Sequence, residues 1–346
     1  MEFTRRHVVI GASLVGGARI LSRAAYAKEL SWDGKTVTFY VGIPPGGSYD
    51  MFPRILAEFM AKRIPGNPRI IVENMPGAGS LTMMNYLYNL APRDGTAIGF
   101  PMNTVLLEPT LKLMSGSGGS VKFDLSKVSW LGTPGSDPAV LWVSSSSPIK
   151  TFAELRGKPL NLGATAPSAD SFLVESLCNK LLGTQIKIIS GYAGLADYAI
   201  AFERGEIDGA ATDFAGLSIA RPDWLETGKI RVLAQFGMNR SAALPDVPTA
   251  VELAENDDAR AMLGLFSIKY TAAYPVVLPP GIGLDAYQVL KAAFIETSKD
   301  PGYQEQLSKL RLASGLVSSD EVTSMVAQAA AASSKVIDGL RAALTA

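Results

Sequence analysis

Apolar segments of strand length alternate with amphipathic segments along most of this chain. The run 37–43 (VTFYVGI) predicts a buried strand, and apolar residues then recur at helical spacing from about Asp50 to the Pro65-Gly66 stop. Further strands are predicted at 69–73, 96–100, 160–163, 186–189, 207–211 and 230–236, and helices at 81–90, 170–182, before Arg204-Gly205, 284–310 and 320–344. This repeated order of strand, turn and helix indicates α/β layers with largely parallel strands.

The first 27 residues have the layout of an export signal. A short basic start precedes the apolar run 8–18, and Ala25-Tyr26-Ala27 offers a small-x-small cleavage site. The run is shorter than the roughly 20 residues that cross a membrane, so we expect cleavage and no membrane insertion. Arg5-Arg6 resembles a twin-arginine signal, with an ordinary secretory signal as the alternative. Either route takes a mature chain that begins near Lys28 to the periplasm.

Composition excludes several classes of function. The mature chain is long enough for two lobes of roughly 150 residues each. The formal net charge of the full 346-residue chain is zero, so the sequence shows no electrostatic footprint for nucleic acid or an anionic membrane surface. The one cysteine, Cys178, cannot form an internal disulfide, and the helical spacing around it predicts a buried thiol.

The histidine count restricts the possible chemistry further. The one histidine, His7, lies in the segment that we expect to be removed. A mature chain without imidazole excludes Ser-His-Asp and Cys-His nucleophiles, histidine general bases and histidine-ligated metals. Catalysis by carboxylates, lysine or tyrosine stays open, but we expect a protein that is not an enzyme and that uses no cofactor and no metal.

Four turns between a strand and a helix are rich in Gly, Ala, Ser and Thr. They lie at 44–50, 74–82, 164–168 and 190–194, and the first two contain no Lys or Arg. Such turns present free backbone N–H groups at a helix N-terminus, where an anion is attracted, and they lie where open α/β sheets bind ligands. The alternative is an ordinary set of helix caps. Neither a Walker A motif nor G-x-G-x-x-G is present, which disfavours a nucleotide.

Several longer segments carry a family resemblance. VGIPPGGSYDMFPRILAEFMAKRIPG, IIVENMPGAGS, APRDGTAIGF and RVLAQFGMNRSAALPDVPTAVEL occur in that order along the chain. Together they resemble the Bug, or TctC, family, the extracytoplasmic solute receptors of tripartite tricarboxylate transporters. The resemblance implies a type II periplasmic-binding-protein fold, with two α/β lobes that close on a ligand. We expect one lobe of residues 28–138 plus 264–346 and another of residues 139–263.

The resemblance also implies the ligand and the site. Family ligands are small carboxylates, aliphatic or aromatic, so we expect a monomeric receptor that passes such an acid to membrane transporter subunits. The implied ligand-binding residues come from two loops of the first lobe and three turns of the second: Pro45, Gly46, Gly47, Ser48, Tyr49, Asp50, Gly77, Ala78, Gly79, Ser80, Ala166, Ser168, Asp170, Gly194 and Asp213.

Alternatives stay open for single residues and for the whole chain. Asp50 is at least as well suited to capping the turn as to contacting a ligand, and Asp213 either accepts a hydrogen bond from the ligand or is a solvated turn residue. A receptor that signals to a membrane sensor kinase is the alternative to a transport receptor. A histidine-free enzyme on the same fold is the third possibility.

Overall fold

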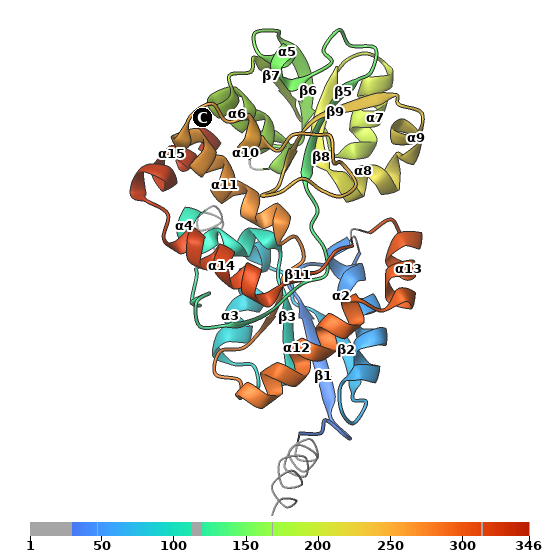
Figure 1. Ribbon diagram of the computed structural model, residues 1–346, viewed down its shortest axis with the longest axis vertical. Helices are drawn as coiled ribbons and strands as arrows, with labels where there is room; N and C mark the ends of the chain where they lie inside the picture. The colour runs from blue at the N-terminus through green and yellow to red at the C-terminus, as the bar shows by residue number, and fades with distance from the viewer. Residues whose placement is uncertain (1–29, 47, 113–119, 168, 313, 346) are drawn as a thin grey trace, which may run out of the picture.

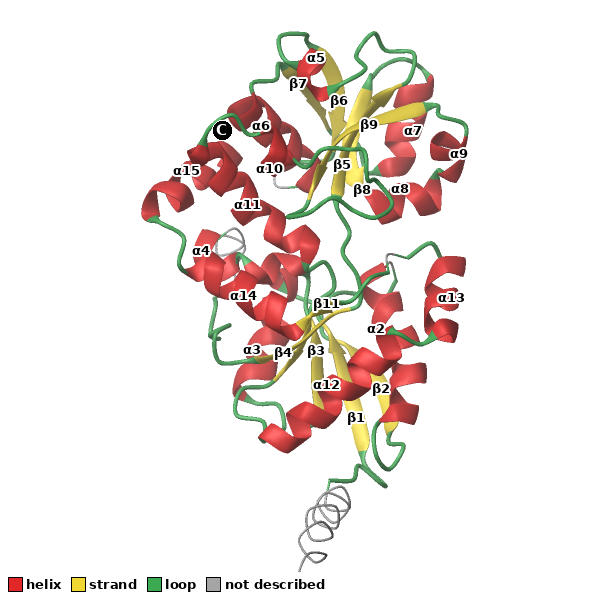
Figure 2. Ribbon diagram, in the orientation of Figure 1, coloured by secondary structure: helices red, strands yellow, loops and turns green. Residues whose placement is uncertain are grey.

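Two sheets, each flanked by helices, form an upper and a lower lobe in the computed structural model (Figures 1 and 2). The structure describes residues 30–46, 48–112, 120–167, 169–312 and 314–345, so the expected export signal lies outside the described residues. None of the helices in these ranges is long and apolar enough to span a membrane. The expected α/β class with two lobes is confirmed.

The lower lobe contains a six-stranded sheet with the order β11-β4-β10-β3-β1-β2. β1 pairs in parallel with β2 and β3, whereas β10 and β11 pair antiparallel with their neighbours, so the sheet is mixed rather than largely parallel. Its strands are β1 (Thr36–Val41), β2 (Arg69–Asn74), β3 (Ala97–Phe100), β4 (Ser129–Thr133), β10 (Val276–Leu278) and β11 (Val317–Ser318). Its helices are α2 (Ser48–Met60), η1 (Ala61–Arg63), η2 (Ala78–Ser80), α3 (Leu81–Asn89), η3 (Asn103–Leu106), α4 (Glu108–Leu111), α12 (Leu284–Ser298), α13 (Pro301–Lys309) and α14 (Ser319–Ala330).

The upper lobe contains a five-stranded sheet with the order β7-β6-β8-β5-β9. β6 pairs in parallel with β7 and β8, and β5 pairs antiparallel with β8 and β9. Its strands are β5 (Ala139–Ser144), β6 (Leu160–Ala164), β7 (Ile186–Ser190), β8 (Gly209–Asp213) and β9 (Ile230–Phe236). Its helices are α5 (Phe152–Leu155), α6 (Asp170–Leu182), α7 (Leu195–Glu203), α8 (Phe214–Ala220), α9 (Pro222–Glu226) and α10 (Ala250–Leu253).

Two further helices, α11 (Asp257–Thr271) and α15 (Ser334–Thr345), lie along one side of both lobes (Figure 1). Each packs against α6 of the upper lobe; α11 also contacts η3 of the lower lobe, and α15 also contacts α4. The chain passes between the lobes in the connection from β4 to β5 and again between α11 and β10. These short connections are where a hinge motion would be absorbed.

The core follows the alternation of side chains along the strands. In β5, Leu141 and Val143 join the cluster that contains α6 and α11, while Val140 and Trp142 join a cluster on the opposite face of the sheet. All four side chains are fully buried. The sequence of β5 is therefore a continuous apolar run and lacks the alternation of a strand with one solvent-exposed face. Cys178 is buried in α6, as its helical spacing predicted.

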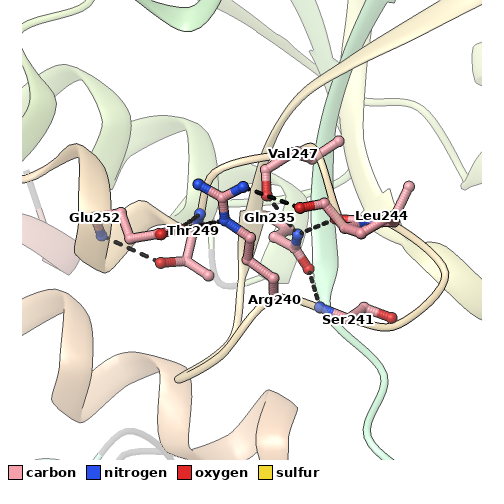
Figure 3. A network of polar contacts seen from close by, with 8 residues as sticks. Gln235, Arg240, Ser241, Leu244, Val247, Thr249 and Glu252 are labelled. Carbon is pink, nitrogen blue, oxygen red and sulfur yellow. Dashed lines mark hydrogen bonds and ion pairs between the residues drawn. The ribbon is translucent and has the colours of Figure 1, made fainter.

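The segment that carries the LPDVPT motif folds back across β9 around one buried side chain, Gln235 (Figure 3). Its amide nitrogen donates to the carbonyls of Leu244 (2.9 Å) and Val247 (2.7 Å), and its oxygen accepts from the Ser241 amide. Arg240 bonds the Glu252 carboxylate. The same carboxylate forms a capping box with Thr249 at the start of α10. This motif therefore has a structural role in the upper lobe, holding the loop 237–249 in place.

Candidate ligand-binding cleft

A cavity of about 590 Å³ is lined by residues of both lobes. Its volume suits a small molecule, since ligand pockets typically measure about 300–1,000 Å³. A second cavity of about 250 Å³ shares Asp170, Asp213 and Tyr270 with it and continues to Gly194. The larger cavity is lined by Ser48, Tyr49, Gly79, Met102, Asn103, Thr104, Asp137, Ala169, Asp170, Leu173, Asp213, Lys269, Tyr270 and Ala273.

The cavities lie where parallel strands end and helices begin. β1 leads into α2 at Ser48, β6 into α6 at Asp170, β7 into α7 after Gly194, and β8 into α8 after Asp213. The first backbone N–H groups of each helix have no partner within the helix. At α8 they donate to Pro138, Asp137 and Asp213 instead, so the donors left for a ligand belong to the other helix beginnings. The turns that the sequence singled out are therefore brought together from both lobes, as ligand sites in open α/β sheets require.

Asp50 holds the first turn through its buried carboxylate. Its Oδ2 accepts from the Gly46 amide at 2.9 Å and from Arg54 Nε at 3.0 Å, and its Oδ1 accepts from Arg54 Nη2 and Asn74 Nδ2, both at 2.8 Å. Burial raises the pKa of this carboxyl, but the hydrogen bonds from Arg54, Asn74 and Gly46 outweigh burial and lower it to about 2. The Gly46 amide is thus already used inside the protein.

The second loop has a left-handed backbone at three successive residues. Ala78, Gly79 and Ser80 have φ of 44°, 60° and 75°, a conformation that costs energy at the two residues with a side chain. The buried Ser80 hydroxyl donates to the Gly42 carbonyl and accepts from the Met102 amide, both at 3.0 Å. A Cβ on Gly42 would lie 2.3 Å from Ser80 Oγ, so only glycine fits there. This packing presents Gly79 to the cavity.

The residues that the sequence proposed as ligand contacts fall into three groups. Those that line a cavity are Ser48, Tyr49, Gly79, Asp170, Gly194 and Asp213. Those absent from both linings are Pro45, Gly46, Asp50, Gly77, Ala78, Ser80 and Ala166. Gly47 and Ser168 lie outside the described residues. The Asp50 and Ser80 side chains are turned into the scaffold of the loops, and the assignment of ligand contacts stays a prediction.

Other lining residues had no signal in the sequence, because they come from η3, from the connections between the lobes and from α11. One of them is Thr104 in η3. Its hydroxyl is buried and makes no hydrogen bond to any described residue. A buried hydroxyl without a partner is costly unless something outside the chain completes it.

Asp137 occupies the connection between β4 and β5 and is almost fully buried. Its carboxylate accepts from the Ala215 amide at 3.0 Å and from the Tyr274 hydroxyl at 2.9 Å, and its own amide donates to the Tyr270 carbonyl. Burial and then the nearby Asp213 carboxylate raise the pKa of Asp137 to about 7. One side chain therefore ties α8 of the upper lobe to the connections between the lobes.

Lys269 lies in α11, and its side chain is only 1% exposed. Its ammonium nitrogen is 2.6 Å from Asp170 Oδ1 and rests over the rings of Phe266 and Tyr270 at 4.3 and 4.7 Å from their centroids. The Tyr270 hydroxyl donates to the other oxygen of Asp170 at 3.2 Å. Among the described residues that line the larger cavity, Lys269 is the one cation.

Comparison with known proteins adds a family. Residues 52–341 match the model of the tripartite tricarboxylate transporter family receptor, TctC. The chain is 28% identical to the UPF0065 protein in the gbd 5' region of Cupriavidus necator, over 97% of this chain and 98% of that one. It is 26% identical to the protein BugT of Bordetella pertussis, over 73% and 75% of the two chains.

Solved structures share the fold. A TctC solute-binding protein from Polaromonas, without ligand, superposes with a TM-score of 0.66 at 19% identity, covering 85% of this chain and 94% of that one. The Rhodopseudomonas palustris protein Rpa4515 with adipate gives 0.60 at 20% identity, covering 90% and 98%. MatC of the same organism with bound malate gives 0.55 at 20% identity, covering 88% and 98%. The type II periplasmic-binding-protein fold that the resemblance implied is confirmed.

Proposed function

Because this chain belongs to the TctC family of tripartite tricarboxylate transporter receptors, we propose that it captures a small carboxylate in the periplasm and delivers it to a tripartite membrane transporter. It is a solute-binding receptor rather than an enzyme. Two relatives with the same fold hold adipate and malate, which supports a carboxylate as the ligand. The export signal in the sequence supports the periplasmic location. The fold and the family assignment do not depend on that signal.

The observation that carries this proposal is the cavity of about 590 Å³ between helix beginnings of the two lobes. Ser48 and Tyr49 begin α2, and the neighbouring loop contributes Gly79. Neutral backbone and hydroxyl donors at a helix N-terminus stabilise a carboxylate without a paired arginine. We place the ligand carboxylate against this lower-lobe wall, where the Thr104 hydroxyl makes no hydrogen bond to the residues that the structure describes.

Capture in this arrangement requires the lobes to close. We propose two lobes that move against each other, residues 28–138 with 264–346 and residues 139–263. Because the boundary at 263/264 falls inside α11, the moving part of the second lobe extends to the end of that helix. The bending would be confined to the connections that contain Asp137 and the residues after α11. Closure would bring the beginnings of α6 and α8 over a ligand already held at α2.

The test begins with the mature protein, from Lys28 onward, and its melting temperature against mono-, di- and tricarboxylates, aromatic acids and their amides. A ligand at a hundred times its dissociation constant should add about 2.7 kcal/mol of stability, which a thermal scan resolves. Binding without consumption of the ligand supports a receptor. If no acid in the panel shifts the melting temperature, the carboxylate proposal is wrong.

Thr104→Val should then separate binding from stability. The substitution keeps the shape and removes a buried hydroxyl without a partner, so the free energy of unfolding should stay the same or rise by about 1 kcal/mol. Affinity for the acid found in the panel should fall by about tenfold, the value of one lost hydrogen bond. Calorimetric titration measures the affinity, and Thr227→Val in the upper lobe is the matched control. Unchanged affinity would remove Thr104 from the site.

A further inference from the structure

Asp137 is a buried carboxyl group that lines the larger cavity without a cation of its own. It is 8% exposed, and its carboxylate accepts from the Ala215 amide and the Tyr274 hydroxyl, which are both neutral donors. The one cation among the described residues that line this cavity, Lys269, is paired with Asp170 at 2.6 Å. The negative charge of an ionised Asp137 is therefore stabilised by neutral hydrogen bonds rather than by a countercharge.

The groups around Asp137 come from each neighbouring element. Burial raises the pKa of Asp137, and the charge of Asp213 at the end of β8 raises it further, to about 7. Burial also raises the pKa of the three tyrosines here well above the usual value of 10, so these hydroxyls are neutral near pH 7. From α2, α6, α11 and the segment before β10, the titratable and charged groups are Tyr49, Asp170, Lys269, Tyr270 and Tyr274. Asp137 itself therefore exchanges its proton near neutral pH.

The place proposed for the ligand carboxylate is next to this group. Tyr49 belongs to the lower-lobe wall, and its ring lies 4.9 Å from that of Tyr274, whose hydroxyl donates to Asp137 at 2.9 Å. After burial, the charge of Asp137 is the largest cause that raises the pKa of Tyr49, so the two side chains are close. An anion held at this wall would add another negative charge beside Asp137. A like charge nearby favours the protonated form of a carboxyl group.

We propose that the receptor takes up a proton on Asp137 when it captures an acid, so that the solute anion and the proton are bound together. This proposal rests on the proposed function, because it concerns the regulation of the same cleft. The proton comes from the solvent, cancels the charge of Asp137 while the anion is held, and returns to the solvent when the solute leaves. Protonated Asp137 also gains an O–H donor that the carboxylate lacks.

The sign of the pH dependence follows from this linkage. Binding raises the pKa of Asp137 above its value of about 7 in the free receptor, so the liganded receptor holds more protons than the free receptor just above neutral pH. Affinity should therefore fall by about tenfold between pH 6.5 and pH 8.5. The ligand itself cannot cause this fall, because an ordinary carboxyl group has a pKa of about 4 and is ionised throughout the range. Nor can an imidazole, because His7 lies in the segment that we expect to be removed.

Calorimetric titration of the mature chain, from Lys28 onward, counts the proton directly. The probes are butyrate, malate, adipate and benzoate, and the one that binds most tightly is titrated at pH 7.5 in HEPES and in Tris, two buffers with different ionisation enthalpies. Free Asp137 would be about one quarter protonated at this pH, so the dependence of the observed enthalpy on the buffer should show uptake of about half a proton or more per acid. Binding without proton uptake, or with proton release, overturns the inference and leaves the carboxylate receptor standing. No binding of any probe contradicts both.

Asp137→Asn assigns the proton to one side chain. Asparagine has the shape of a protonated aspartate and cannot ionise, so affinity in this variant should stay constant within about twofold from pH 6.5 to pH 8.5, and proton uptake should vanish. At pH 8.5 the variant should bind the acid more tightly than the wild type.

Glu175→Gln is the matched control. Glu175 is another buried carboxyl group whose pKa is raised by burial, but it is absent from the linings of both cavities, so this variant should keep the proton uptake of the wild type. A wild-type pH dependence in Asp137→Asn, in a variant that unfolds cooperatively, also overturns the inference. If Asp137→Asn does not fold, the proton count of the wild type decides by itself.

Discussion

Asp50→Ala should lower the free energy of unfolding by about 2–3 kcal/mol at neutral pH, the value typical of hydrogen bonds to a charged acceptor, because the Arg54 side chain that is left behind is 45% exposed and stays hydrated. The buried carboxylate joins the Gly46 amide, the Arg54 guanidinium and the Asn74 amide, and the variant leaves all of these donors without their acceptor. Because the same turn leads into Ser48 and Tyr49, ligand binding should be lost as well. Urea denaturation followed by calorimetric titration measures both effects.

The stability difference between the wild type and Asp50→Ala should depend on pH with a defined sign. The pKa of Asp50 is lowered from 3.8 to about 2 in the folded protein, so its ionised form contributes stability that is fully present above about pH 4. As pH falls from 4 to 2, the wild-type protein loses this contribution, and the gap between the wild type and Asp50→Ala should narrow by about 2 kcal/mol. A gap that stays constant over this range would show that the charge of Asp50 does not stabilise the turn. Glu305→Gln, which breaks an exposed pair with Lys309, should change stability by less than about 0.5 kcal/mol.

The two partners of the Lys269–Asp170 pair should be unequal when they are removed one at a time. The Lys269 side chain is 1% exposed and that of Asp170 is 48% exposed. Asp170→Ala strands an ammonium group in the protein interior and should cost about 3–5 kcal/mol of unfolding free energy. Lys269→Met leaves a carboxylate that water and the Tyr270 hydroxyl still solvate, so it should cost less than about 1 kcal/mol.

A double-mutant cycle by urea denaturation checks this asymmetry. The double variant Asp170→Ala with Lys269→Met should be close in stability to Lys269→Met alone, because the second change removes the stranded charge. Equal losses for the two single variants, with no recovery in the double variant, would contradict the assignment of Lys269 as a buried charge that depends on Asp170.

The sequence predicted the helices and strands whose apolar residues lie on one face, or whose ends carry a capping residue, a proline or a glycine. The helix expected at 170–182 and the strand expected at 230–236 are found with those bounds as α6 and β9. The helical stretch expected at 284–310 is divided into α12 and α13, because Asp300 caps a new helix with proline at its first position. Residues that begin or end a helix are thus easier to recognise in the sequence than the way the helix packs in the fold.

The elements that escaped prediction are those packed on more than one side. β5 and β10 are short and buried on both faces, and α11 contacts other helices of both lobes, so none of them shows a simple alternation or a single apolar stripe. The same reason hid Asp137 and Lys269, whose place at the cavity depends on how these elements cross between the lobes. The turns at 44–50 and 74–82 were found because their composition alone marks them. The sequence could not show that Asp50 and Ser80 point into the scaffold, since each hydrogen bond there joins residues from separate elements.

The single buried thiol makes the proposed closure of the lobes open to direct observation. Cys178 is sealed in α6, and burial raises its pKa, so it has little of the thiolate form that reacts with labelling reagents. A cysteine introduced at exposed Leu90, beside α3, and another at exposed Ile200, in α7, would each take a spin label without removal of the native thiol. Pulsed electron paramagnetic resonance would then report the separation of the lobes in solution, with and without the captured solute.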